Sequence, residues 1–158
     1  MTDHVEQVLA EWKRERPDLD PSPMAVIGRL SRVTRRAGDQ LARDFARHGI
    51  DAATFDVLAT LRRSGSPFSL SPKDLTSSAM VTSSAIAQRL NKLEAQGLVT
   101  RSPSDADGRA KQVRLTDRGR HLVDAILPDH LATERAILAS MSPERQALLA
   151  SLLAELDQ

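Results

Sequence analysis

The chain has 158 residues, of which 41% are hydrophobic and 27% charged, a composition that fits one globular domain with short extensions. It contains no Cys, which excludes a disulfide framework, a thiolate zinc site and a thiol redox switch. No apolar run approaches the length of a membrane span and the start of the chain does not fit a secretory signal, so we expect a cytoplasmic protein with no membrane partner.

The net charge of +1 is unevenly distributed along the chain. Residues 81–120 hold eight basic and four acidic side chains, whereas residues 121–158 hold two basic and six acidic ones. The first of these segments suits a polyanionic partner such as a nucleic acid. A solvated basic face is the alternative, and charge alone does not decide between the two.

The N-terminal part of the chain, residues 1–48, is predicted to form two helices. The first, over 3–16, begins at Asp3, a good N-cap residue, and has Trp12 on its apolar stripe. The second covers 23–48 and starts at Ser22-Pro23, because Ser caps a helix well and Pro fits the first helical position.

The central part, residues 51–116, combines helices with a basic hairpin. The predicted elements are a helix over 51–63, a short helix from 71 to about 78, a helix over 82–96, and two strands at 98–101 and 111–115 joined by a loop. Thr82 is placed to cap the third helix and Gly97 to end it. The two strands are recognised by alternation of apolar with polar or basic residues.

The C-terminal part, residues 117–158, is predicted to be helical. Thr116 can cap a long helix, in which Pro128 is expected to cause a kink or an interruption. A last, leucine-rich helix follows Ser142-Pro143. The predicted fold class is therefore mainly α with a small β-hairpin.

The helix over 82–96 has two unlike faces. Ile86, Leu90 and Leu93 form an apolar stripe, and short polar side chains occupy the opposite face. Hydroxyls and amides of this kind suit base edges in a major groove, and the first helical turn suits a phosphate. The predicted DNA contacts on this helix are Thr82, Ser83, Ser84, Gln88, Asn91 and Lys92. A polar outer face that only meets solvent is the common alternative.

The hairpin supplies a second predicted contact with double-stranded DNA. Arg109 lies at its tip and Lys111 follows, and a guanidinium on a thin turn can enter a minor groove. Asp107 can orient that guanidinium through a charge-assisted hydrogen bond. Helix and hairpin together predict a winged helix-turn-helix that binds DNA.

The stretch Met80–Gly119 resembles the recognition helix and wing of the MarR family of bacterial regulators. The hairpin carries that family's D-x-R pattern at Asp107 and Arg109, followed by a V-x-L-T-x-x-G exit that starts at Val113. The resemblance implies a homodimer in which the N- and C-terminal helices of both subunits interleave. It also implies a repressor whose two recognition helices meet a pseudo-palindromic operator.

The added N-terminal helix, with GRLSR at Gly28–Arg32 and FDVLATLRRSG at Phe55–Gly65, narrows the likeness to the PecS/UrtR subgroup, which includes urate-responsive repressors. The positions that match the subgroup's sensing residues are Trp12, Asp56, Arg89 and Arg101. An aromatic surface and guanidinium groups suit a flat acidic heterocycle. An anion bound there is expected to draw Arg89 away from Asp56 and shift the recognition helix.

Each predicted ligand residue also has a simpler interpretation. Trp12 fits packing in a core or an interface, and Arg89 fits a phosphate contact. Asp56 shares a polar helix face with Thr60 and Arg63, which fits a solvated surface.

Three alternatives concern the whole chain. An enzyme is disfavoured because the four histidines are scattered and no glycine-rich phosphate loop is present, so we expect no metal and no cofactor. A helical interaction module that does not bind DNA has no need of a basic wing. A regulator of the same fold that senses a phenolic or other organic acid differs only in its ligand.

Overall fold

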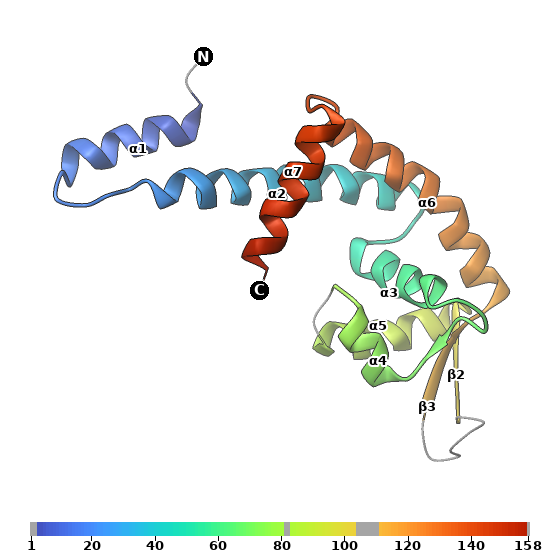
Figure 1. The fold of residues 1–158 in the computed structure, drawn as a ribbon. Coiled ribbons are helices and arrows are strands. Elements are labelled where there is room, and N and C mark those ends of the chain that lie inside the picture. Colours follow the sequence, from blue (N-terminus) through green and yellow to red (C-terminus); the bar gives the residue numbers. More distant parts are fainter. Residues whose placement is uncertain (1–2, 81–82, 104–110, 158) are drawn as a thin grey trace. The chain divides into compact units, whose positions relative to one another are not determined.

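A computed structural model describes residues 3–80, 83–103 and 111–157 of the chain, and its fold is mostly helical with one small sheet, as predicted (Figure 1). The elements are α1 (His4–Glu15), α2 (Pro23–Arg47), α3 (Ala52–Arg63), β1 (Ser69–Leu70), α4 (Pro72–Ser78), α5 (Ser83–Ala95), β2 (Val99–Pro103), β3 (Lys111–Leu115), α6 (Asp117–Leu138) and α7 (Pro143–Leu156). They fall into two units, residues 1–40 and 41–158, so that α2 contributes to both.

Helix starts follow the predicted capping residues. The side chains of Ser71 and Ser142 accept hydrogen bonds from backbone N–H groups three residues on, and proline occupies the first turn of α4 and α7. Thr116 accepts from the N–H of Gly119 at 3.0 Å and so caps α6. These starts are local properties of the sequence because each cap satisfies N–H groups that have no partner within the helix.

The sheet has one strand more than the predicted hairpin. Its order is β1-β3-β2, and both pairs are antiparallel. β2 and β3 pair from Val99 with Leu115 to Pro103 with Lys111, which confirms the predicted strands. The added strand β1 holds only Ser69 and Leu70, too short a segment to show any alternation.

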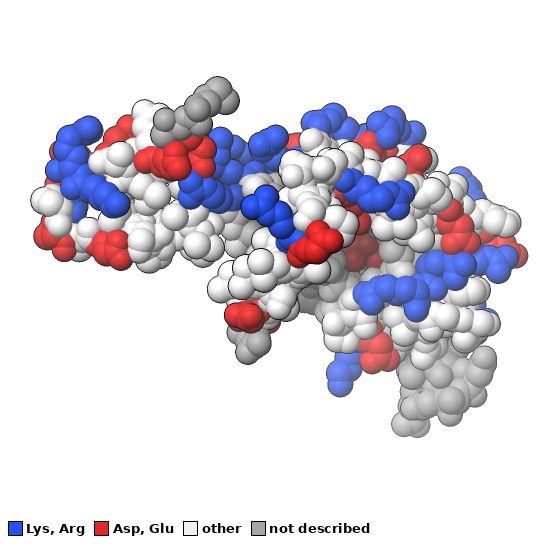
Figure 2. All heavy atoms as spheres, turned by 45° about the horizontal axis from the view of Figure 1, so that its top comes forward, with Lys and Arg blue, Asp and Glu red and all other residues white. Residues whose placement is uncertain are grey.

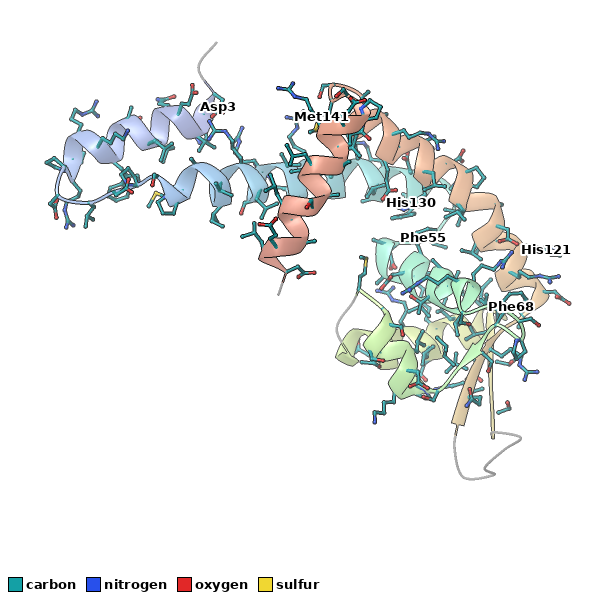
Figure 3. The ribbon with its side chains drawn as sticks, viewed as in Figure 1. Asp3, Phe55, Phe68, His121, His130 and Met141 are labelled. Carbon is teal, nitrogen blue, oxygen red and sulfur yellow. The ribbon has the colours of Figure 1, made fainter. Side chains whose placement is uncertain are left out.

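The hydrophobic core lies in the second unit and joins α3, α4, α5, the sheet and α6. Its fully buried members include Leu58, Leu61, Leu75, Leu93 and Val113. An aromatic group extends this core toward the end of α2: Figure 3 shows Phe55 of α3 and His130 of α6 close together, with ring centroids 4.6 Å apart. Within this core, α5 packs against β2 and α3.

Gly119, in the first turn of α6, allows this helix to lie close to the backbone of Leu98, just after α5. A Cβ atom at Gly119 would lie 2.1 Å from the carbonyl oxygen of Leu98, a distance that no side chain tolerates. The turn that precedes Leu98 is made by Gly97, whose φ of +66° is the left-handed conformation expected of a helix stop. The predicted end of the recognition helix is thus confirmed.

Pro128 does not interrupt its helix. α6 runs continuously from Asp117 to Leu138 with Pro128 inside it, and its ribbon bends along the way (Figure 1). Proline removes one N–H donor and crowds the preceding turn, which favours a bend without requiring a break.

The first unit is held together by a polar cap that is shared between two helices. Asp3 accepts hydrogen bonds from the N–H groups of Val5 and Glu6 at the start of α1. Its other oxygen accepts from Nε of Arg29 on α2 at 2.8 Å. The Val5 side chain is buried and lies 3.5 Å from where a Cβ of Gly28 would be.

Across the described ranges, no helix is long and apolar enough to cross a membrane.

Candidate nucleic-acid interface and ligand residues

The two faces of α5 are divided as the sequence predicts. Ile86, Leu90 and Leu93 are at most 4% exposed and belong to the core. Gln88, Asn91 and Lys92 are exposed on the other side of the helix. The core therefore orients α5 so that Gln88, Asn91 and Lys92 lie on its exposed side, as a helix entering a major groove requires.

Part of the predicted interface falls outside the described residues. Thr82, Asp107 and Arg109 belong to this group, so their predicted roles stay predictions. Ser83 and Ser84 form the first turn of α5, and Lys111 begins β3 opposite Pro103, with only their backbones described. They lie at a helix start and at the base of the hairpin, and their contacts with DNA stay predictions.

Arg101, one of the predicted ligand residues, contacts a predicted DNA-reading residue. From β2 it donates through Nη2 to Oδ1 of Asn91 at 2.9 Å and through Nε to Oε2 of Glu94, also at 2.9 Å. Its backbone N–H donates to the other carboxylate oxygen of Glu94 at 3.2 Å. The hydrogen bonds from Arg101 lower the pKa of Glu94, and those to Glu94 raise the pKa of Arg101. Both groups are therefore charged at neutral pH.

Arg89 pairs with Asp51, which differs from the expected partner, Asp56. Nη1 of Arg89 donates to Oδ2 of Asp51, the N-cap of α3, whose Oδ1 accepts from the N–H of Thr54 at 2.8 Å. Burial raises the pKa of Asp51, but the hydrogen bonds from Thr54 and the positive charge of Arg89 outweigh it and lower the pKa overall. The expected coupling of α5 to α3 through Arg89 is present, and the carboxylate that provides it starts α3.

The face of α3 that holds Asp56 is only partly buried, because Asp56 is half-buried and Arg63 is exposed. Thr60, on the same face, is 1% exposed. Oδ2 of Asp56 accepts from the N–H of Met80 at 2.7 Å, and Arg63 donates to the carbonyl oxygen of Ser78. Asp56 and Arg63 thus bind the backbone at the end of α4 and just after it, so Asp56 has a structural contact in addition to its partial exposure to solvent.

Trp12 lies on α1 in the first unit and is 44% exposed. The other three predicted ligand residues belong to the second unit. A single pocket formed by Trp12, Asp56, Arg89 and Arg101 therefore remains a prediction.

Sequence reasoning missed two acidic residues that hold the basic ones. The sequence indicates Asp51 only as the start of a helix, although a capping carboxylate has a second oxygen that can accept from a cation. Glu94 gave a clearer signal, since it lies three positions after Asn91 and such residues are neighbours on a helix surface. Its contact with Arg101 depends on the path of the chain through Gly97, which no pattern in the sequence reveals.

Basic and acidic side chains are interspersed on the visible surface (Figure 2). No group of acidic or histidine side chains in the described ranges has the arrangement of a metal site. Most of the exposed large apolar side chains lie on three helices. On α2 they are Met24, Val26, Ile27, Leu30 and Val33; on α6 and α7 they are Leu127, Leu131, Leu148, Leu149, Leu152, Leu153 and Leu156.

Comparisons with known proteins agree with this arrangement. A model of the MarR family matches residues 48–110. The HTH-type transcriptional regulator PecS of Dickeya dadantii is 38% identical over 154 residues, which cover 98% of this chain and 93% of that protein. Sco3205, a MarR family transcriptional regulator from Streptomyces coelicolor solved in complex with DNA, superposes with a TM-score of 0.79 at 23% identity and 88% coverage of each chain. BpsR of Bordetella bronchiseptica, whose DNA binding is regulated by 6-hydroxynicotinic acid, has a TM-score of 0.76 at 24% identity, covering 84% of this chain and 93% of its own.

Proposed function

Because the chain belongs to the MarR family of DNA-binding transcriptional regulators, we propose that it is a repressor that binds a pseudo-palindromic operator as a homodimer and is released by a small acidic ligand such as urate. Because members of this family are transcriptional regulators, family membership also disfavours the alternative that the protein is an enzyme. The observation that carries the DNA-binding role is the exposed polar face of α5 on a buried apolar stripe.

The proposed mode of binding places α5 in the major groove and the hairpin tip in the adjacent minor groove. Gln88 and Asn91 offer amides to base edges, and Lys92 offers a charge to the backbone. A twofold dimer presents two such helices, so the half-sites should lie about one helical turn apart.

The homodimer is supported by the apolar side chains that the chain leaves exposed. Five leucines of α7 are between 37% and 62% exposed, and none of the helix is buried. In α2, Val26, Ile27 and Val33 are each more than half exposed. A monomer seldom exposes so many large apolar residues on its long helices, whereas a second copy would cover them.

The acidic ligand is supported by the arginines near α5 and by the ligand of BpsR. 6-Hydroxynicotinic acid is a flat heterocycle with a carboxylate, and urate is likewise flat and acidic. A ligand of this type would compete with Asp51 for Arg89, and losing that pair would free α5 from the start of α3. A phenolic or other organic acid satisfies the same chemistry and is the second candidate class.

DNA binding is tested by measuring the affinity for an operator, taken from a selection with random duplexes, at several salt concentrations. Replacing Arg109 with Ala should weaken binding and reduce the slope of log affinity against log salt by about one. The control is Arg14→Ala, which removes an arginine from the exposed side of α1. A wild-type protein that prefers no duplex at low salt would contradict the proposal and favour an interaction module.

Ligand binding is tested through Trp12, which is the only tryptophan of the chain. Titration with urate should change its fluorescence, after correction for ligand absorbance, and should release the operator. Arg89→Ala should abolish release while the protein still binds DNA. If urate has no effect but salicylate or another phenolic acid releases the operator, the ligand class changes and the fold-level proposal stands.

A further inference from the structure

We propose that Glu94 is a positioning residue that holds Arg101 and, through it, fixes the side chain of Asn91 so that its amide nitrogen faces the DNA. This inference rests on the proposed DNA-binding role and adds a determinant of base preference to it. The three residues are called the Glu94 clamp below.

The clamp begins with an unpaired edge of the sheet. β2 is the last strand in the order β1-β3-β2, so among the described residues one of its sides has no neighbouring strand. On this side the N–H of Arg101 donates to Oε1 of Glu94 at 3.2 Å. At this point the backbone N–H of the edge strand is satisfied by a carboxylate of α5. This hydrogen bond connects the recognition helix to the wing.

The same carboxylate orients the guanidinium. Nε of Arg101 donates to Oε2 of Glu94 at 2.9 Å, and Nη2 donates to the same oxygen. Two hydrogen bonds from one planar guanidinium fix its direction as well as its position. The side chains of Arg101 and Glu94 are 34% and 37% exposed, so the pair is partly shielded from water.

The held guanidinium then reaches Asn91. Nη2 of Arg101 donates to Oδ1 of Asn91 at 2.9 Å. Asn91 and Glu94 are three residues apart and are therefore neighbours on the helix, which allows one arginine to contact both. The amide oxygen faces Arg101, and the amide nitrogen with its two hydrogens is left for an outside partner.

This orientation affects which bases Asn91 can recognise. A freely rotating asparagine can pair with adenine through both its oxygen and its nitrogen. Arg101 occupies one of the two lone pairs of the Asn91 oxygen and places a positive charge beside it, so the amide nitrogen is the group that Asn91 presents, which suits acceptors such as N7 and O6 of guanine or O4 of thymine. The clamp therefore favours acceptor-rich base edges at the position that Asn91 contacts.

The first experiment examines the clamp without DNA. In a 1H–15N spectrum of the free protein, Nε–H of Arg101 should give a signal protected from exchange, and Glu94→Gln should remove that protection. Glu155→Gln on the exposed part of α7 also removes one carboxylate and should leave the signal unchanged. An Arg101 signal that is unprotected in the wild type would overturn the proposal, whatever the protein does with DNA.

The second experiment measures base preference by selection from a randomised operator library at one salt concentration. Glu94→Gln should lower the preference at one position of each half-site by about fivefold to tenfold. In an Asn91→Ala background, the same change should have no further effect at that position, because the residue being positioned is gone. Thermal unfolding of each variant shows whether it is folded.

The outcomes separate three explanations. If Glu94 acts only as a negative charge, Glu94→Gln should strengthen binding to all sequences equally and leave the base preference unchanged, which contradicts positioning. A preference lost equally in both backgrounds would also contradict it, since the effect would not pass through Asn91. A wild type without any base preference would overturn the proposed function and this reading role together, while a protected Arg101 signal would still establish the contact itself.

Discussion

The winged-helix body, residues 51–116, buries most of its large apolar side chains, whereas the terminal helix α7 leaves its leucines exposed. α3 buries six residues within the chain's own core, including Leu58 and Leu61, whereas α7 of comparable length buries none. Both helices are rich in apolar residues, so hydrophobic content does not distinguish them. The body of this protein completes its core within one chain, whereas α7 leaves its leucines exposed, which is the observation behind the proposed dimer.

The comparison predicts that one charge in α7 separates the subunits. Leu152 is 49% exposed in the single chain, and Leu152→Glu would place an unpaired carboxylate where a second copy is proposed to pack. The cost of burying it, about 3 kcal/mol or more, corresponds to at least a hundredfold rise in the dimer dissociation constant. Sedimentation analysis measures that change, and operator affinity should fall with it.

The control for this variant is the neighbouring residue. Ser151→Glu introduces the same charge about 100° around the helix, away from Leu152, and should leave the oligomeric state unaltered. If Leu152→Glu sediments as the wild type does, α7 is not the dimer surface. The exposed leucines of α7 would then need another explanation.

A core substitution in the body should have the opposite pattern of effects. Leu58 is completely buried, and Leu58→Ala should lower the free energy of unfolding by about 2–5 kcal/mol through lost contacts and a cavity. Denaturant unfolding measures this loss at a protein concentration where the wild type is dimeric. The folded variant should still dimerise, because Leu58 belongs to the body. Equal stability of Leu58→Ala and the wild type would show that the core is not where the structure has it.

The sequence predicts local features of this fold well. Ser71, Thr116 and Ser142 begin helices as expected because a cap acts on the next three residues. The buried stripe of α5 follows from helical periodicity alone. β1 was missed because a two-residue strand exists only through its partner β3, and that partner lies more than 40 residues away.

The candidate site was predictable in its residue types but not in its contacts. The polar face of α5 and the basic wing follow from spacing and composition. The partners of the arginines do not, because Asp51 and Glu94 reach them only after α3, α5 and β2 have packed. The resemblance predicts that Asp56 pairs with Arg89, whereas in the structure Arg89 pairs with Asp51. A resemblance assigns residue types to positions, but it does not give the distances between them.

The smallest predicted effect concerns the polar contact between α5 and the N-cap of α3. Asp51 both caps α3 and pairs with Arg89, and Asp51→Asn separates these roles because Asn caps a helix nearly as well. Loss of a half-exposed ion pair should lower stability by about 0.5 kcal/mol, and Asp51→Ala should lose about 1 kcal/mol more because the cap is also removed. Denaturant unfolding of the three proteins at neutral pH compares these values.

The pH dependence gives that comparison its sign. The pKa of Asp51 is lower in the folded protein than in the unfolded chain, so its charge stabilises the fold above the unfolded pKa. This stabilisation is lost as the pH falls through the lowered folded pKa, where the carboxyl group becomes protonated in both states. The difference in unfolding free energy between the wild type and Asp51→Asn should therefore be constant near neutral pH and shrink in acid. A difference that persists unchanged in acid would mean that the charge of Asp51 does not act on Arg89.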